Sequence, residues 1–391
     1  MQFNHAVSEK PLRVVELARI LAGPWIGQTF ADLGADVIKV ESPAGDDTRT
    51  WGPPFIEREG DRSAAYFHAC NRGKRSVTAD LTSAEGIDLV RRLAAQADVF
   101  VENFKVGGLA KYGLDYPSLR ALNPRLVYCS VTGFGQDGPK AALAGYDFMI
   151  QGLSGIMDLT GEPTGEPQKI GVAFADIFTA LYGVVAIQAA LARREQTGTG
   201  DWVDMSLLDC MTGVLANQAL NFLATGNSPT RLGNAHPNIA PYQTLPVSDG
   251  HLIVACGNDR QFVALCDVLG CDELIGDARF QSNEARLAHR RLLTEALQQK
   301  TLGFERDVLI AQLQDAGVPV GPINSVADAF ADPQVRHRAM QIAPGNVPGV
   351  RSPLRFTDYD LSLEQPAPKL GEHNVQVLAE LQALEAAAVQ S

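Results

Sequence analysis

Short apolar runs alternate with stretches of helical periodicity along the first half of the chain. Residues 12–18 (LRVVELA) form an apolar run that predicts a buried strand. The next stretch, 20–35, carries apolar residues at helical spacing, and Pro24 stands near its start, where a helix tolerates proline. Residues 35–42 (ADVIKVES) predict a second strand. These three segments therefore predict one βαβ unit with a parallel pair of strands.

The alternation of strands and helices continues as far as residue 135. Further strands are predicted at 75–81, 98–104 and 125–135, and helices at 82–97 and 116–124. The helix at 82–97 has Thr82 as its expected cap, with Glu85 three residues on. Such alternation is typical of the α/β class, so we expect a Rossmann-like, open parallel sheet with helices on both faces.

One long apolar helix is predicted from Val172 to Arg194. It contains Asp176, Gln188 and a tyrosine, and these polar residues favour a helix buried in a protein over one that crosses a membrane. A further strand and helix are expected over 202–225. The second half of the larger domain therefore continues the α/β pattern.

The composition of the sequence changes around residues 225–243, where glycine, asparagine and proline replace the alternation of apolar runs and helical periodicity. This change predicts a domain boundary. We expect a large domain over 1–226, a smaller α+β domain over 227–329, and a C-terminal part over 330–391 that is rich in loops, ends in a helix and completes the large domain. The small domain contains a predicted hairpin turned by Asp249 and Gly250.

Composition narrows the range of partners. The 391 residues include 33 basic and 45 acidic side chains, a net charge of -12, which argues against nucleic acid or an anionic membrane as the partner. None of the six cysteines forms a Cys-x-x-Cys pair, so we expect buried free thiols and a cytoplasmic location. The opening MQFNHAVSEK lacks a basic segment followed by an apolar run, so no signal peptide is expected.

One segment matches the residue spacing of the dinucleotide-binding fingerprint. Gly133, Gly135 and Gly138 follow a predicted strand with the G-x-G-x-x-G spacing, and Asp158 stands twenty residues beyond the last glycine. Pro139 follows at once, however, so no helix N-terminus is expected to open on the glycines and hold a pyrophosphate. A plain turn is the favoured interpretation, and an NAD-dependent oxidoreductase stays as an alternative.

Asp176 has two interpretations from its residue type and setting. An aspartate at this place is typical of a helix N-terminus, where the dipole favours a negative charge. The surrounding stretch is otherwise alanine, valine, isoleucine, phenylalanine and leucine. A carboxylate nucleophile needs such a rigid element and apolar wall. The residues alone leave both interpretations open.

Two groups of basic residues lie at the ends of predicted strands: Arg72, Lys74 and Arg75, and then Lys105 and Lys111. Solvated surface charge is one interpretation. The other is a site for a nucleotide diphosphate, because ligands of open α/β sheets bind beside strand ends. No histidine pair has metal-ligand spacing and no G-x-S-x-G motif occurs, so neither a metal site nor a serine hydrolase is expected.

Several long segments together resemble the class III CoA-transferases, the family of formyl-CoA transferase and carnitine CoA-transferase. The resemblance covers nearly the whole chain. The segments that carry it are LAGPWIGQTFADLGADVIKVESPAGDDTR, NRGKRS, DVFVENF, GFGQDGP, the helix with Asp176, and KLGEHN. The nucleophilic aspartate of this family falls on Asp176, so the resemblance implies transfer of CoA between small carboxylic acids through an aspartyl-CoA thioester on that residue.

The resemblance also implies where CoA and substrate bind. Residues matching the CoA site are Ile20, Leu21, Ala79, Asp80, Leu81, Asn103, Phe104, Lys105, Lys111 and Tyr146. Lys105 and Lys111 are expected to meet phosphates, and Trp51, Tyr66 and Tyr146 to line the acyl or acceptor pocket. The family fold implies an interlocked homodimer. CoA and acyl-CoA are expected as substrates, with no permanently bound cofactor.

Two departures from formyl-CoA transferase bear on the substrate. Leu21 stands where that enzyme has a glutamine, and CGNDRQF replaces its glycine-rich loop. The closer likeness is to the succinyl-CoA:glutarate type, through GDDTRTWGPPF, AHPNIAPYQ, GNDRQF and GVPVGPIN. A short dicarboxylate acceptor with succinyl-CoA as donor is therefore expected, with Arg19 or Arg49 as the cation for the distal carboxylate.

Two further functions remain as alternatives. One is an α-methylacyl-CoA racemase, because such enzymes share the fold. The racemases, however, have a catalytic histidine at the position of Tyr146 in this chain. Tyrosine is a weaker base than imidazole at neutral pH. The second is a non-catalytic acyl-CoA-binding protein, which turnover with any donor and acceptor pair would exclude.

Overall fold

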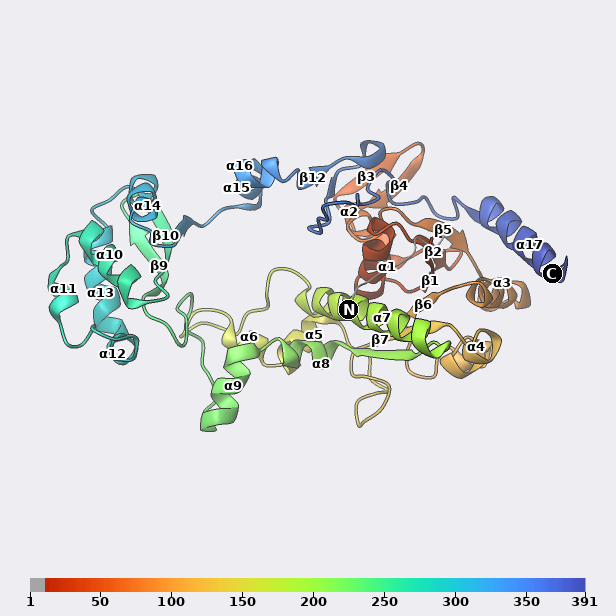
Figure 1. The fold of residues 1–391 in the computed structure, drawn as a ribbon, viewed down its shortest axis with the longest axis horizontal. Helices are drawn as coiled ribbons and strands as arrows, with labels where there is room; N and C mark the ends of the chain where they lie inside the picture. The colour runs from red at the N-terminus through yellow and green to blue at the C-terminus, as the bar shows by residue number, and fades with distance from the viewer. Residues whose placement is uncertain (1–10, 391) are drawn as a thin grey trace. The chain divides into compact units, whose positions relative to one another are not determined.

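The computed structural model describes residues 11–390, which form two compact units (Figure 1). Unit 1 contains the chain up to Ser154, the segment Ile170–Leu215 and the tail from Pro333; unit 2 contains Gly155–Lys169 and Ala216–Asp332. The sequence-based boundaries were 226/227 and 329/330, whereas the corresponding changes of unit lie at 215/216 and 332/333. The segment 155–169, which was expected in the large domain, belongs to unit 2. The segment MQFNHAVSEK, with its expectation of no signal peptide, lies outside the described residues.

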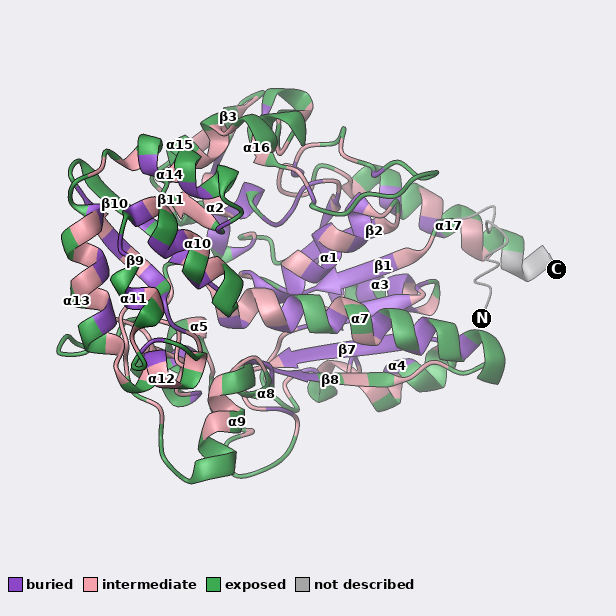
Figure 2. Ribbon diagram, turned by 60° about the vertical axis from the view of Figure 1, so that its left-hand side comes forward, coloured by how far each residue is buried: buried purple, intermediate pink, exposed green. Residues whose placement is uncertain are grey.

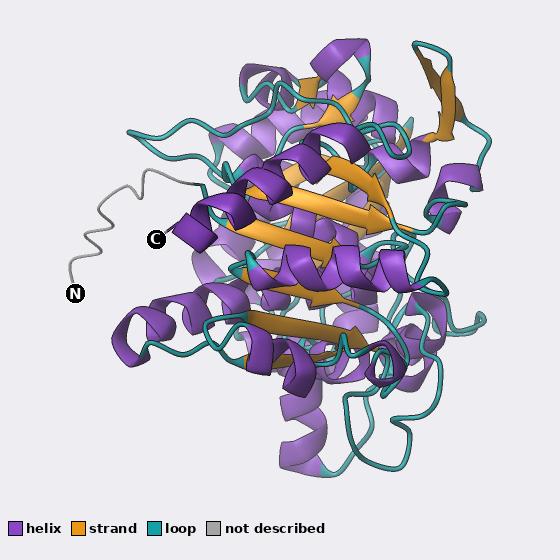
Figure 3. Ribbon diagram, turned by 90° about the vertical axis from the view of Figure 1, so that its right-hand side faces the viewer, coloured by secondary structure: helices purple, strands orange, loops and turns teal. Residues whose placement is uncertain are grey.

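A six-stranded parallel sheet forms the centre of unit 1, as predicted (Figure 3). In spatial order its strands are β5 (Arg75–Thr78), β2 (Asp36–Glu41), β1 (Arg13–Leu17), β6 (Val99–Glu102), β7 (Val127–Thr132) and β8 (Trp202–Ser206). Valine-rich runs such as VVEL and VFVE form these strands because both faces of the sheet are covered, and a branched side chain fits on each face. Figure 2 shows β1 and β7 as buried.

Helices cover both faces of the sheet, which confirms the predicted architecture. One face is covered by α1 (Ala22–Asp32) and α7 (Phe174–Thr197), and the other by α3 (Ala84–Ala95), α4 (Tyr116–Leu122) and α17 (Asn374–Gln390). The second face holds a hydrophobic core in which Val15, Ile38 and Phe100 meet the helices. The predicted cap Thr82 is wrong, because Ser83 caps α3 by accepting from the Gly86 amide.

The strand order contains one reversal. From β1 the sheet grows through β2 to β5 on one side, and through β6 and β7 to β8 on the other. The switch point therefore lies between β1 and β6. Ligands of open α/β sheets bind in the crevice outside the carboxyl ends of the strands at such a point. Residues 18–21 and 103–105 follow these two strands and form this edge.

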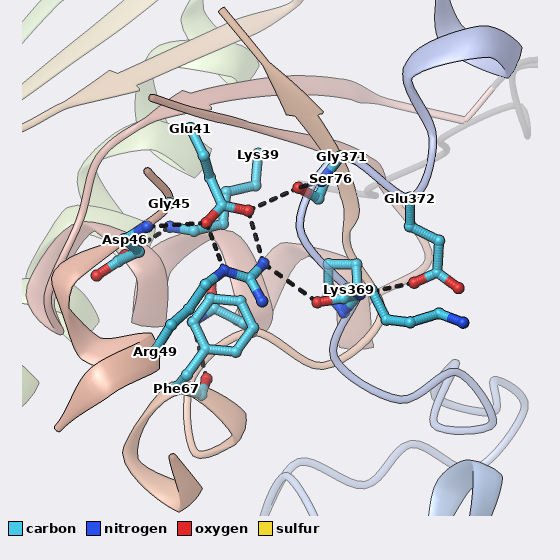
Figure 4. A network of polar contacts seen from close by, with 12 residues as sticks. Lys39, Glu41, Gly45, Asp46, Arg49, Phe67, Ser76, Lys369, Gly371 and Glu372 are labelled. Carbon is cyan, nitrogen blue, oxygen red and sulfur yellow. Dashed lines mark hydrogen bonds and ion pairs between the residues drawn. The ribbon is translucent and has the colours of Figure 1, made fainter. Parts of the chain in front are cut away.

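The tail returns to the sheet and is fastened along β5. The amide of Gly371 donates to Ser76 Oγ at 3.0 Å (Figure 4), and the Asn374 side chain exchanges two hydrogen bonds with Thr78. The KLGEHN segment, 369–374, thus occupies the open edge of the sheet. Covering an edge strand in this way prevents it from pairing with another chain.

Helix α7 is long and apolar enough to cross a membrane by length and composition, a test that core helices of soluble proteins also pass. In this chain it packs on α1 and on strands β7 and β8. Gly183 lets the two helices approach closely, because a Cβ there would lie 2.7 Å from Ile26 Cδ1. A stripe of α7 nevertheless stays exposed, including Tyr182 and Val185.

Unit 2 has the expected α+β composition. Its antiparallel sheet has the order β11 (Val320–Pro322), β10 (Gly250–Ala255), β9 (Tyr242–Val247). Helices α10 (Asp259–Leu269), α11 (Glu273–Gly276), α13 (Arg290–Thr301) and α14 (Arg306–Asp315) share a hydrophobic core with it, and α12 (Asn283–Ala288) contacts α13. The predicted hairpin is confirmed, although its turn residues are Ser248 and Asp249, and Gly250 already pairs with Val247.

The remaining elements are shorter. Unit 1 also contains η1 (Asp47–Thr50), β3 (Phe55–Arg58), β4 (Asp61–Ala64), α2 (Ala65–His68), η2 (Ala110–Tyr112), α5 (Asp147–Leu153), α8 (Leu207–Gly213), α16 (Pro333–His337), β12 (Gln341–Ile342), η3 (Pro344–Asn346) and β13 (Gly349–Val350). Unit 2 also contains α6 (Ile156–Leu159), α9 (Ala216–Thr225) and α15 (Val326–Ala331). The helix expected around 202–225 is therefore divided into α8 and α9.

Candidate active site

Asp176 lies in the first turn of α7, three residues after the N-cap Ala173. The amide groups of a first helical turn have no partner within the helix. One of them, the Ala175 amide, donates to Asp147 Oδ1 at 2.8 Å. Asp147 is the first residue of α5, so the residue next to Asp176 is fixed by a side chain from a neighbouring helix.

A second side chain of α5 extends this support. Gln151 donates to Asp147 Oδ2 at 2.8 Å and accepts from the Ile170 amide at 2.8 Å. Both side chains together hold the segment 170–175 that leads into α7. Asp147 and Gln151 were not predicted from the sequence, since each looks like an ordinary residue of a short helix. Their role depends on the approach of two helices that the sequence does not specify.

The surroundings of Asp176 disfavour its charged form. Burial, and to a smaller extent the nearby charge of Asp147, raises the pKa of its carboxyl group to about 7. Burial also raises the pKa of Tyr66 to about 12, and the charge of Asp176 is the next largest cause. The Tyr66 hydroxyl therefore stays protonated at neutral pH beside a carboxyl group that ionises near pH 7.

Aromatic side chains expected at the pocket lie in the same part of unit 1. The rings of Trp51 and Tyr66 meet edge to face, with 5.4 Å between their centroids. Trp51 is 45% exposed. Tyr146 is exposed as well and serves as the N-cap of α5, directly before Asp147. Two of the three predicted aromatic residues are thus brought together, and the third adjoins the residue that supports Asp176.

The predicted residues at the ends of β1 and β6 are joined at the switch point. Asn103 accepts from the Arg19 amide at 3.0 Å and donates to the Arg19 carbonyl oxygen at 2.7 Å. Leu21 is the N-cap of α1, and Ile20 between them has a positive φ of 74°. Phe104 and Lys105 follow Asn103 and complete the edge.

The two candidate arginines differ in their partners. Arg49 is buried and bound in a bidentate manner by Glu41, with distances of 2.8 and 2.7 Å, and it also donates to the Pro368 carbonyl oxygen. Its guanidinium lies 3.7 Å from the centroid of the Phe67 ring (Figure 4). Arg19 is exposed, and one of its terminal nitrogens binds Asp47 at 2.5 Å.

The basic residues of NRGKRS are used inside the fold. Arg72 pairs with Asp32 at 2.6 Å and Lys74 with Glu16 at 2.7 Å, and all four side chains are buried. Both earlier interpretations, solvated charge and phosphate ligand, are therefore wrong for Arg72 and Lys74. Arg75 binds Asp36 and Glu380, which ties the sheet to α17.

Lys105 and Lys111 differ from that group because both are exposed. Lys111 belongs to η2, where its ammonium lies 4.6 Å from the Tyr112 ring centroid. Positive charge at this edge of the sheet therefore faces solvent.

A separate hollow of about 460 Å³ lies where β5 ends, next to the N-terminus of α3. Its lining residues are Thr78, Ala79, Asp80, Ser83, Glu85, Gly86, Asp88, Leu89, Arg92 and Leu378. Two predicted CoA-binding residues, Ala79 and Asp80, are therefore part of a surface depression, and the third, Leu81, packs beside the core.

The glycine fingerprint has a packing role. No helix begins on these glycines, since the next described helix is α5, which starts at Asp147. Gly133 is required because a Cβ there would lie 2.5 Å from the Gly145 Cα. The structure thus lacks the helix N-terminus that a dinucleotide pyrophosphate requires in this part of the described chain.

The cysteines and potential metal ligands give simpler results. All six cysteines are free and buried, as expected. Over the described part of the chain, no group of three or more His, Cys, Asp or Glu side chains is arranged to hold a metal ion.

Comparison with known proteins agrees with this geometry. The family description "CoA-transferase family III" matches residues 10–374. A succinate–glutarate CoA-transferase of Agrobacterium fabrum is 56% identical over 382 residues, covering 96% of each protein. The human succinyl-CoA:glutarate CoA-transferase is 38% identical, over 95% of this chain and 86% of its own length.

A solved structure shows the same fold. The crystal structure of a CaiB/BaiF family protein from Brucella suis matches with a TM-score of 0.87 at 67% identity, over 95% of this chain and 98% of that one. At this coverage the match extends over both units of the chain. The chain therefore belongs to CoA-transferase family III and is a CoA-transferase.

Proposed function

We propose that this enzyme transfers CoA from succinyl-CoA to a short dicarboxylic acid through an aspartyl-CoA thioester on Asp176. The observation that carries the proposal is the setting of that carboxylate. It stands in the first turn of α7 and is partly buried, and Asp147 holds the start of this helix through the amide of the preceding residue, Ala175. The names of the relatives from Agrobacterium fabrum and human supply the substrate class, since both include succinate or succinyl-CoA and glutarate.

The first half of the reaction loads the enzyme. The Asp176 carboxylate attacks the thioester carbon of succinyl-CoA, the carbon–sulfur bond breaks, and a mixed anhydride and CoA thiolate result. The thiolate then attacks the aspartyl carbon of the anhydride and displaces succinate. Asp176 now carries CoA as a thioester. No proton is gained or lost overall, and the energy of the thioester is kept.

The second half returns CoA to a new acid. The acceptor carboxylate attacks the aspartyl thioester and gives a second anhydride and free CoA thiolate. The thiolate attacks the acceptor's acyl carbon, which releases the new acyl-CoA and restores the Asp176 carboxylate. Water must be excluded at both anhydride stages because it would hydrolyse them.

The local electrostatics suit this chemistry. A carboxylate that burial destabilises has lost part of its hydration shell, so less solvent must be removed when it attacks. Tyr66 remains protonated because its pKa is about 12, and a neutral hydroxyl can donate a hydrogen bond to an oxyanion nearby. Asp176 and Tyr66 are thus assigned as nucleophile and hydrogen-bond donor.

CoA is placed along the carboxyl edge of the sheet of unit 1. The proposed contacts are Ile20, Leu21, Ala79, Asp80, Leu81, Asn103, Phe104, Lys105, Lys111 and Tyr146. Exposed lysines at 105 and 111 suit the phosphates. The hollow beside Ala79 has acidic side chains on its rim, which would repel phosphate, so an uncharged portion of CoA such as its base is assigned there.

Arg19 is the proposed partner of the acceptor's distal carboxylate. Arg49 is unsuited, because Glu41 already binds it on two nitrogens and its charge is buried. Arg19 is exposed at the switch point, and only one of its terminal nitrogens forms an ion pair with Asp47 in the described structure. Its remaining donors can bind a second carboxylate, which compensates for the desolvation of that group.

We also propose the interlocked homodimer as the working form. Helices α5 and α7 pack together and expose large apolar side chains, namely Phe148, Met149, Leu181, Tyr182 and Val185. Large apolar side chains that stay exposed on two packed helices are typical of a protein interface. Sedimentation that shows a stable, folded monomer at micromolar concentration would contradict this assignment.

An acceptor screen tests the substrate assignment. Succinyl-CoA is offered with glutarate, other four- to six-carbon dicarboxylates, acetate and butyrate, and the acyl-CoA products are identified by mass spectrometry. We expect dicarboxylates to be preferred, and Arg19→Leu to reduce their kcat/KM by about tenfold or more while monocarboxylates change little. Preference for monocarboxylates in the wild type would refute the substrate class, and an equal loss for all acids would refute the role of Arg19.

A further inference from the structure

Ile20 has a backbone conformation that its residue type disfavours. Its φ is 74°, in the left-handed region that asparagine and glycine tolerate but β-branched residues rarely adopt. Strain of this kind persists only where the surroundings hold the backbone, and it is concentrated at functional sites. Ile20 stands at the switch point of the sheet, immediately before the N-cap of α1.

A carboxylate of the GDDTR loop, residues 45–49, holds this turn. The Ile20 amide donates to both oxygens of Asp46, each at 3.3 Å. Asp46 is buried and does not reach the solvent-exposed edge itself. Its effect on a ligand must therefore pass through the backbone of the turn 19–21.

Asp46 is itself fixed on every side. Lys39 Nζ lies 2.9 Å from Oδ2, while the amide and hydroxyl of Thr48 donate to Oδ1 at 3.0 and 2.8 Å. The Asp46 amide donates to Glu41 Oε2 at 3.0 Å (Figure 4). These contacts leave the carboxylate one orientation, so it acts as a rigid anchor for the amide of Ile20.

The anchor is connected to the rest of unit 1 by buried charges. Lys39 also binds Glu16 at 3.1 Å, and Glu16 binds Lys74 at 2.7 Å. On the other side Glu41 accepts from Arg49 and from the Ser76 hydroxyl, the latter at 2.6 Å (Figure 4). The ion pairs that NRGKRS and GDDTR supply thus converge on the carboxylate that holds the turn.

We propose that Asp46 is a positioning residue for CoA binding: it holds the turn 19–21 in the left-handed conformation that presents this edge of the sheet to CoA. The proposal rests on the proposed function, which places CoA at this turn. Asp46 makes no contact with the reacting atoms, so its loss weakens CoA binding more than it slows the chemical steps.

A merely structural Asp46 would serve to neutralise Lys39. The two roles differ in their dependence on residue 20. Glycine adopts a positive φ as readily as a negative one. In an Ile20→Gly background the turn therefore depends less on Asp46 to keep its left-handed conformation. A positioning role therefore predicts that Asp46→Asn costs less affinity in this background, whereas loss of charge neutralisation would cost the same in both.

The experiment measures binding of CoA alone, which cannot turn over, by isothermal titration calorimetry. In the wild-type background, Asp46→Asn is expected to raise the Kd for CoA by about tenfold, as for the loss of a charge-assisted hydrogen bond. In the Ile20→Gly background the same change is expected to raise it by about threefold or less. Glu57→Gln, at an exposed carboxylate of β3, is the charge-matched control and leaves the Kd unchanged.

Equal losses in both backgrounds, or no loss in either, would overturn the proposal. A wild-type enzyme that does not bind CoA would instead overturn the CoA site of the proposed function. Thr48→Val provides a second variant if Asp46→Asn does not fold, because it removes only the hydroxyl contact to Oδ1. It should raise the Kd by about twofold to threefold, with kcat nearly unchanged, and an unchanged Kd would refute the positioning role.

Discussion

Replacing Asp176 with asparagine should make the protein more stable at alkaline pH while abolishing CoA transfer. Burial raises the pKa of the carboxyl group from its ordinary value of 3.8 to about 7. Between these two pH values the folded protein binds the proton more tightly than the unfolded chain does. The stability of the wild type therefore falls as the pH rises through this window, and asparagine removes the effect.

The size of the effect follows from the pKa values. A difference of one pKa unit corresponds to about 1.4 kcal/mol, so the full change would cost the wild type about 4 kcal/mol above pH 7. Asp176 is partly exposed and lies at the positive end of α7, and both facts favour the charged form. We therefore expect a cost of about 2 kcal/mol at pH 8.

Thermal unfolding of the wild type and of Asp176→Asn, followed by calorimetry at pH 4.5 and pH 8, measures this cost. At pH 8 the variant should unfold about 2–5 °C higher than the wild type. At pH 4.5, which is still above the ordinary pKa of 3.8, the difference should be about half as large. Glu57→Gln removes an exposed carboxylate and should show no such pH dependence. A variant no more stable than the wild type at pH 8 would refute the argument that burial destabilises the charged Asp176.

Three other substitutions test separate parts of the account. Asp147→Asn keeps an acceptor for the backbone amide but removes a negative charge, so it should lower the pKa of Asp176. The acidic limb of the kcat/KM profile should therefore move to lower pH by about half to one pH unit. Arg49→Leu leaves Glu41 buried without its partner and should cost about 3–5 kcal/mol in urea unfolding, affecting all acceptors alike. Gly27→Ala puts a methyl group 1.8 Å from a buried carboxylate oxygen, which should destabilise the protein by about 1–3 kcal/mol in the same assay.

Each of these three predictions has an outcome that would contradict it. If the acidic limb of the kcat/KM profile of Asp147→Asn lies at the same pH as in the wild type or at a higher pH, the charge of Asp147 does not act on the nucleophile. Loss of activity confined to dicarboxylates in Arg49→Leu would show that this arginine binds substrate after all. Gly213→Ala is the control for Gly27→Ala, since nothing lies within 4 Å of a Cβ there, and equal effects at both glycines would refute the steric argument.

The architecture of unit 1 was largely predictable, because periodicity records burial. Strands such as VVEL are apolar throughout since they are covered on both faces, and each was found within a few residues of its predicted position. The split of the helix after β8 into α8 and α9 was missed. Ala216, at the break, has a positive φ of 47°, which no apolar pattern reveals.

The candidate site was predictable only in part. Asp176 and the residues at the strand ends came from resemblance to a family, since an aspartate near a helix start is common. The side chains that support them could not be found in this way. Asp147 and Asp46 act on residues 28 and 26 positions away, and contacts at such separation depend on how helices and loops pack.

The same limit applies to the charged residues of NRGKRS and GDDTR. Their composition predicts exposure, because isolated charges are costly to bury. In the fold each finds an opposite charge at close range, as Arg72 does with Asp32 and Arg49 with Glu41. Pairing across the sheet reverses the expectation that residue type alone would give.

The proposed mechanism requires a covalent bond between CoA and Asp176. The wild-type enzyme is mixed with succinyl-CoA without an acceptor, quenched in acid and digested, and the peptide that contains Asp176 is analysed by mass spectrometry. We expect this peptide to carry CoA as a thioester, to lose it when glutarate is added before quenching, and to remain unmodified in Asp176→Asn. An enzyme that turns over without this adduct, or that carries CoA on another residue, would contradict the mechanism.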